Sequence, residues 1–233
     1  MSQSMLRQVY EQAWPKLSSA LAASAESDRL SYPLLIDIEA HNYLRAPKKL
    51  FVIGQQTSTW YGRWSDLRTD ANPISRLLGI YREFQLGRDV FLAPFWSAAH
   101  RIYRDLNPCG PPDGFAWSNL IKMDEDGECP RWGLEQLIRE TFNVLPSEIE
   151  LAKPDVAIFF TGPDYDETIE EVFGQISKIE IRPYSERLLI RIQDSKGRLP
   201  VHSYRTCHPG YFAYSGKPAH LADIIETVRK LVA

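Results

Sequence analysis

Short apolar runs alternate with segments of helical periodicity along most of this chain. The apolar runs predict strands over LFVIG (50–54), GFAWSNLIKM (114–123), PDVAIFFTG (154–162), RLLIRIQ (187–193) and VHSYRTCHPGYF (201–212), the last running into a loop. Helical spacing predicts helices over 4–24, from Pro73 onward, over 95–106, through 134–153, over 166–176 and over 218–231. Alternation of strands and helices is typical of an α/β domain with a mostly parallel sheet.

The pattern predicts a three-layer α/β/α arrangement around a central, mostly parallel four-stranded sheet. A chain of 233 residues suits one domain. We expect residues 1–45 to form an N-terminal helical segment that packs on a main α/β domain over residues 46–233. We find no internal repeat and no low-complexity segment.

Composition narrows the functional classes. The chain is 44% hydrophobic and 24% charged, as ordered globular proteins are. Its net charge of −3 gives no overall electrostatic footprint for a polyanion and leaves open a local basic groove. The N-terminal residues lack the apolar region of a signal peptide, and no uninterrupted run of about 18 apolar residues occurs, so we expect no membrane association.

The cysteines point to a reducing compartment. Cys109, Cys129 and Cys207 are scattered and form no CxxC pair, which disfavours zinc and iron–sulfur frameworks. Glycine spacings for dinucleotide or phosphate loops are also missing. We therefore expect a cytoplasmic, monomeric protein without a metal or other cofactor.

Polar groups follow the predicted strands where those strands end. The ends carry Gly54-Gln55-Gln56, Ser118-Asn119, Thr161-Gly162 and Cys207-His208-Pro209. Ligands of parallel α/β sheets bind beyond the carboxyl ends of the strands. Taken singly, Asn119 is more typical of a residue that satisfies nearby backbone groups, and His208 of a structural histidine. Their convergence at one edge favours a site.

The order of these motifs resembles the uracil-DNA glycosylase superfamily. That family has a strand entering a Gly-Gln-Asp-Pro-Tyr-His or Gly-Glu-Ala-Pro-Gly loop, then a uracil-reading Asn, a PxVvvxlG strand and a His-Pro-Ser loop. The corresponding segments here are VIGQQTSTW, WSNLIKMD, KPDVAIFFTG and TCHPGYF, and the resemblance covers roughly residues 50–230.

The resemblance implies a base-binding pocket and roles for its residues. Asn119 would read the edge of a flipped base. His208 would donate to the departing base and stabilise its negative charge. Gly54 and Gln55 would line the pocket through the loop backbone, while Trp60, Tyr61 or Trp117 would stack on the base. Gln56 would orient the attacking water.

The resemblance also implies a contact with DNA. The family's loop after His-Pro enters the minor groove and wedges a side chain into the base stack. The residues in that place are Pro209, Gly210, Tyr211 and Phe212, with Tyr214 beyond them. Packing of these aromatic residues against the C-terminal helix is the alternative. Phosphates would meet basic residues near the pocket mouth, namely Arg63, Lys122, Arg205 and Lys217.

The sequence departs from the family where water is activated. Gln56 replaces the Asp, and an amide orients water without accepting its proton; loss of a general base costs about 10²–10⁴ in rate. Thr57-Ser58-Thr59 replaces the motif's Pro-Tyr-His, and Gly210 replaces its Ser. The acidic run Asp124–Asp126 is typical of a solvated turn.

Three functions therefore remain open. The first is an N-glycosylase that hydrolyses the base–sugar bond of a flipped base in DNA, as in DNA repair. The second is a nucleic-acid or nucleobase-binding protein that has lost cleavage. The third is a hydrolase of small nucleosides. A positive trough around the pocket would favour DNA, and a neutral cavity would favour a small ligand.

Overall fold

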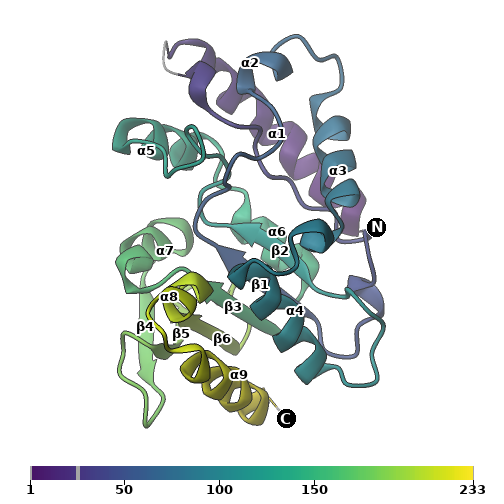
Figure 1. Ribbon diagram of the computed structural model, residues 1–233. Coiled ribbons are helices and arrows are strands. Elements are labelled where there is room, and N and C mark those ends of the chain that lie inside the picture. Colours follow the sequence, from purple (N-terminus) through teal and green to yellow (C-terminus); the bar gives the residue numbers. More distant parts are fainter. Residues whose placement is uncertain (1, 25–26, 233) are drawn as a thin grey trace.

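The structure is a computed structural model that describes residues 2–24 and 27–232. Its centre is a six-stranded sheet in the order β2-β1-β3-β6-β5-β4 (Figure 1). The strands are β1 (Leu50–Gly54), β2 (Ala116–Asn119), β3 (Val156–Phe160), β4 (Ile176–Glu180), β5 (Leu189–Asp194) and β6 (His202–Thr206). The four strands β2, β1, β3 and β6 are parallel, β5 is antiparallel to β6, and β4 is antiparallel to β5.

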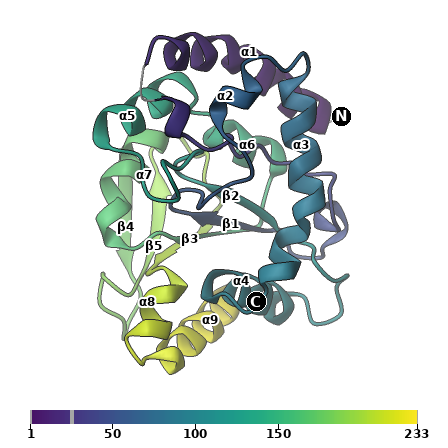
Figure 2. The ribbon, with the colours of Figure 1, turned by 45° about the horizontal axis from the view of Figure 1, so that its top comes forward.

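Helices pack on both faces of this sheet. The α-helices are α1 (Ser2–Ala22), α2 (Trp64–Leu67), α3 (Pro73–Phe84), α4 (Pro94–Leu106), α5 (Trp132–Thr141), α6 (Leu145–Ala152), α7 (Asp166–Phe173), α8 (Pro209–Tyr214) and α9 (Pro218–Val232). The 3₁₀-helices are η1 (Ser27–Arg29), η2 (Tyr43–Arg45), η3 (Gln85–Val90) and η4 (Pro163–Tyr165). Helices α4, α8 and α9 contact one another on one side, and α1 contacts α3, α5 and α6 on the other (Figure 2). The predicted α/β class with a mostly parallel sheet is confirmed.

The prediction of a four-stranded sheet is wrong. The additional strands are β5, whose apolar run is visible in the sequence, and β4, which no pattern indicated. Strand β4 lies at the sheet edge, where Ser177, Lys178 and Glu180 are exposed, so its sequence lacks an apolar run. In β4, Ile176 is buried and Ile179 is intermediate in exposure, so the apolar signal is short.

Two helical segments also differ from the prediction. The single helix expected through 134–153 is two helices, α5 and α6, which are separated at residues 142–144. The loop expected after His208 is the short helix α8, which begins at Pro209. Proline suits the first helical position because its missing N–H would have no intrahelical partner there.

The N-terminal segment shares its core with the rest of the chain. Of the segment 1–45, residues 1, 25 and 26 lie outside the described residues. Leu6, Tyr10 and Leu17 on α1 are fully buried in the hydrophobic cluster that also contains the strands. Helix α1 also contacts α5 and α6 and lies beside these two helices.

A buried polar cluster ties α1 to β2 and α6. The Glu148 carboxylate accepts hydrogen bonds from the Tyr10 hydroxyl (2.9 Å), the Ser118 hydroxyl (2.8 Å) and the Lys122 ammonium (2.5 Å). Burial lowers the pKa of Lys122, and the Glu148 charge opposes that effect. Because Ser118 and Lys122 flank Asn119, this cluster also fixes the position of the strand end.

Replacement of Glu148 by Gln is expected to lower the free energy of unfolding by about 3–5 kcal/mol, since Lys122 then lacks a buried counter-charge. Urea denaturation measures the change. Glu11→Gln in the exposed Arg7–Glu11 pair is the control, with an expected effect of about 0–1 kcal/mol. Equal losses in the two variants would contradict a structural role for the buried cluster.

Candidate functional site

A pocket of about 920 Å³ opens at the carboxyl ends of the parallel strands. Among the sequence-predicted site residues, it brings together Gly54, Gln55, Gln56, Trp60, Tyr61, Asn119 and His208. These residues come from the loop after β1, the end of β2 and the segment between β6 and α8. The volume is within the range of small-molecule sites.

Gly54 allows the Asn119 side chain to cross over β1. The two residues are register partners in the parallel β1–β2 pair. A Cβ at position 54 would collide with Asn119 Oδ1 and would lie 3.3 Å from the Phe95 ring. Glycine is therefore required here by close packing, since the backbone has no room for a side chain.

The Asn119 amide is oriented by the neighbouring tryptophan. Trp117 Nε1 donates a hydrogen bond to Asn119 Oδ1 at 3.1 Å. Asn119 is 2% exposed, and its Nδ2 has no partner within the structure. A buried donor without a partner is costly, and this one belongs to a residue that lines the pocket.

His208 is a neutral ring with its proton on Nε2. Its Nδ1 accepts a hydrogen bond from the Gly210 N–H at 3.1 Å, which caps α8. Burial lowers the pKa of His208 from its ordinary value of 6.5. Since Nδ1 is the acceptor, the neutral ring carries its N–H at Nε2. The Phe95 ring stacks against the imidazole, with centroids 5.8 Å apart.

An aromatic wall encloses one side of the pocket. Trp117 packs edge-on against Trp96 (4.8 Å between ring centroids) and Trp60 (5.3 Å). Phe84 and Phe95 extend the same wall. Such a surface suits a planar ring.

The two glutamines after β1 are both engaged at their amide groups. Gln55 Nε2 donates to the Thr161 carbonyl at 2.8 Å, which ties the loop to the end of β3. Gln56 Oε1 accepts from the Tyr165 hydroxyl at 3.1 Å. Tyr165 on η4 was not identified from the sequence, where it follows Gly162 without a recognisable motif.

Asp124 is buried, whereas the sequence suggested a solvated turn. Its Oδ2 accepts from the Thr57 hydroxyl (2.7 Å) and the Trp60 N–H (3.2 Å), and its Oδ1 accepts from the Gly127 N–H (2.7 Å). These bonds hold the loop that lines the pocket. The carboxylate is thereby committed to the loop, and the acidic residue in the pocket lining is instead Glu128, which is exposed.

The residues predicted to contact DNA differ in their exposure to solvent. Pro209 and Gly210 are buried at the start of α8, and Phe212 is fully buried in the core. Phe212 is therefore not free to wedge into a base stack. Tyr211 is 38% exposed. Tyr214 is 87% exposed and lines the pocket, so it is the aromatic side chain of α8 best placed to meet a ligand.

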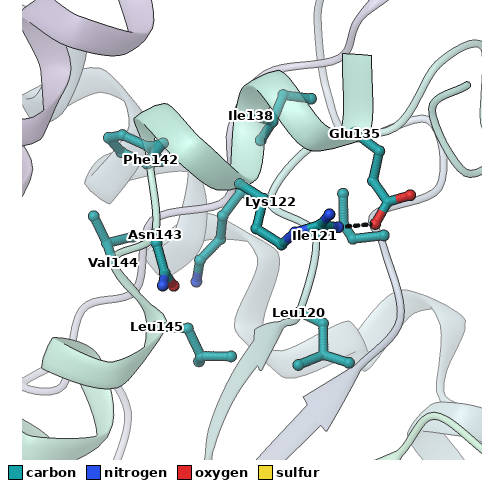
Figure 3. A pocket seen from close by; sticks show the side chains of 10 residues that line it. Leu120, Ile121, Lys122, Glu135, Ile138, Phe142, Asn143, Val144 and Leu145 are labelled. Atoms are coloured by element: carbon teal, nitrogen blue, oxygen red, sulfur yellow. Dashed lines mark hydrogen bonds and ion pairs between the residues drawn. The ribbon is translucent and has the colours of Figure 1, made fainter. Parts of the chain in front are cut away.

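Two basic residues expected near the pocket mouth are in the core. Lys122 pairs with Glu148 and lies beside Asn143 and Val144 at a cavity of about 10 Å³, which has room for about one water-sized sphere (Figure 3). Arg205 is fully buried and pairs with Asp166 through two hydrogen bonds. Arg63 pairs with Asp126 and lines a neighbouring cavity that shares Thr59, Tyr61 and Gly127 with the large pocket. The pocket lining contains no lysine or arginine among the described residues.

The described part of the chain contains no group of three or more His, Cys, Asp or Glu side chains arranged to hold a metal ion. Within residues 2–24 and 27–232, no helix has the length and apolar character to cross a membrane. No family model, no curated protein and no solved structure matches the chain.

The pKa of His208 is expected below 6.5, because burial penalises the charged ring. Since the folded-state pKa is lower than the unfolded one, stability is lost as the pH falls from about 6.5 through the folded value. A ring ¹³C–¹H NMR titration measures the pKa, and His208→Asn assigns the signal. A value of 6.5 or above contradicts the neutral, buried ring.

Replacement of Gly54 by Ala is expected to destabilise the protein by roughly 1–3 kcal/mol, because the added methyl group collides with Asn119. Gly79→Ala on α3 is the matched control, since a Cβ there meets nothing within 4 Å. That helical substitution should stabilise by about 0.5–1 kcal/mol. Urea unfolding compares the two, and a Gly54→Ala protein as stable as the parent would disprove the close packing.

Proposed function

We propose that the protein is an N-glycosylase that binds a flipped base of DNA in this pocket and hydrolyses its bond to the sugar. The observation that carries the proposal is the pairing of two donors in one aromatic pocket. These donors are the buried, unpartnered Nδ2 of Asn119 and the fixed Nε2–H of His208. The resemblance of the motif order to uracil-DNA glycosylases is consistent with this use.

The chemistry follows from the two donors. The C1′–N bond breaks and its electron pair stays with the base, which leaves positive charge on the sugar. The Nε2–H of His208 stabilises the negative charge that develops on a base oxygen. Water then adds its hydroxyl to C1′, and its proton goes to the base, so the products are a free base and an abasic site.

Slow turnover is part of the proposal. Gln56 lies at the position of the family's water-activating Asp, and its Oε1 already accepts from Tyr165. An amide of this kind orients water without taking its proton, so the expected rate is about 10²–10⁴ lower than with a general base. Burial and bonding of Asp124 leave it no free oxygen for that task.

A small nucleoside as substrate is the second candidate. The pocket lining has no lysine or arginine among the described residues, and its acidic member is Glu128. A lining of this charge does not attract phosphates. Pure base binding without cleavage is the related alternative, which the replacement of Asp by Gln56 favours.

The strand order and the free cysteines support two further proposals, one on the fold relationship and one on the cellular location. We propose a uracil-DNA glycosylase-like fold, supported by four parallel strands in the order β2-β1-β3-β6 with the pocket at their carboxyl ends. A cytoplasmic location is supported by free Cys109, Cys129 and Cys207.

Incubation with uracil-containing single- and double-stranded oligonucleotides, and with 2′-deoxyuridine, tests the function. Abasic sites or free uracil are the products to be assayed. His208→Ala should reduce the rate about 10²–10³-fold, because it removes a donor to the leaving base. His220→Ala on α9 is the control and should leave the rate unchanged.

Gln56→Asp supplies a carboxylate at the water position and should raise the rate. Cleavage of 2′-deoxyuridine but not of oligonucleotides would select the nucleoside hydrolase. Cleavage by Gln56→Asp alone would select the binding protein. Lack of cleavage by both proteins, at stoichiometric enzyme and long times, would rule out uracil excision.

A further inference from the structure

We propose that residues 85–92 form a pH-dependent strap over the aromatic wall of the large pocket, which protonated His100 holds closed and which is released when His100 loses its proton. The strap comprises η3 together with Phe91 and Leu92, and it connects α3 to the segment that enters α4. This inference concerns access to the pocket and does not depend on the chemistry performed there.

The strap forms part of the pocket wall. Its Val90 lines the pocket. The chain on either side of the strap supplies three more lining residues, Phe84, Phe95 and Trp96. A Cβ at Gly87 would collide with the Trp96 ring, so the strap backbone lies directly on the indole. Movement of the strap would therefore uncover Trp96 and take Val90 out of the wall.

The strap has a backbone conformation that needs support from its neighbours. Gln85, Leu86 and Gly87 are consecutive residues in the left-handed region, with φ of 49°, 51° and 71°. This conformation costs free energy for a residue with a Cβ and is common only for glycine. The far end of the strap is also exposed, since Val90 is 46% and Leu92 is 91% accessible to solvent. Contacts from other elements must hold such a segment in place.

His100 on α4 makes such a contact from beneath the strap. The residue is buried, and its Nε2 lies 2.9 Å from the Leu86 carbonyl oxygen while its Nδ1 lies 3.3 Å from Asp113 Oδ1. A carbonyl oxygen and an ionised carboxylate accept hydrogen bonds and donate none. Only the protonated ring has an N–H on both nitrogens, so the arrangement fits charged His100. Phe91 and Phe115 pack against the ring and carry no charge.

Asp113 connects the strap to the same charge. The Arg88 guanidinium on the strap donates to Asp113 Oδ2 at 3.3 Å, so one carboxylate links the strap to α4. Two other titratable groups interact with Asp113, namely Tyr103 and His41. Burial raises the pKa of Tyr103 and lowers the pKa of His41, so both are neutral near pH 7. We therefore assign the switch to His100, whose side-chain type titrates between about pH 5 and 8.

Hydrogen–deuterium exchange of the full chain measures closure of the strap. Protection factors, which are corrected for the intrinsic pH dependence of amide exchange, are compared at about pH 5.5 and about pH 8. Strap amides should be about tenfold more protected at the lower pH, because deprotonation turns a lone pair of His100 toward an oxygen atom. The buried amides of β3 are the internal reference and should not show this change, since they report opening of the whole domain.

His100→Asn removes the charge and keeps one side-chain amide as a donor, so strap protection should be low at both pH values. Asp113→Asn removes the counter-charge at a partly exposed position and should also abolish the pH dependence. This second variant carries the test if His100→Asn does not fold. His41→Asn is the matched control, because it removes the neighbouring histidine and should retain the tenfold change.

Equal strap protection at both pH values in the unmodified protein would overturn the inference. A pH dependence that persists in Asp113→Asn and in a folded His100→Asn would overturn it as well, as would one that disappears in His41→Asn. A change of the same size in β3 would show that the whole domain opens and that no separate strap exists. These measurements involve no ligand, so each outcome leaves the proposed function to its own test.

Discussion

The whole site depends on one requirement, namely that buried polar groups at the strand ends find hydrogen-bond partners. Asp124 meets this requirement for the loop after β1, because its two oxygens accept from Thr57, Trp60 and Gly127. The loop shape that results places Gln55, Gln56 and Trp60 in the pocket wall. A general base needs a free lone pair with which to accept a proton from water. A carboxylate that anchors a loop has its oxygens engaged in hydrogen bonds instead. In this chain the oxygens of Asp124 anchor the loop after β1.

Strong apolar runs predicted the central part of the fold correctly. LFVIG and VAIFF are buried along their whole length between parallel neighbours, so their sequences are uniformly apolar and easily recognised. Strand β4 was missed because an edge strand with Ser177, Lys178 and Glu180 exposed has no such signal. The division between α5 and α6 was missed because helical periodicity continues across residues 142–144.

The polar edge of the sheet was predictable and its supporting residues were not. Strand ends and short motifs indicated Gly54, Asn119 and His208, which lie together in the pocket. Lys122 and Arg205 were predicted near the pocket mouth, because charged residues are mostly exposed. Lys122 and Arg205 are buried because their partners, Glu148 and Asp166, come from distant parts of the chain. Pairings of that kind depend on tertiary structure, which a single sequence does not display.

The exposed strand β4 has a consequence for association between copies of the chain. An edge strand offers free backbone groups with which another strand can pair. Lys178 and Glu180 on this strand are exposed, and Lys178 forms ion pairs with Asp166 and Glu186; charged side chains on an edge strand disfavour its pairing with another chain. A second strand that paired there would pack beside the exposed, charged side chains of Lys178 and Glu180. The antiparallel extension thus ends the sheet in a form that resists growth into a larger sheet.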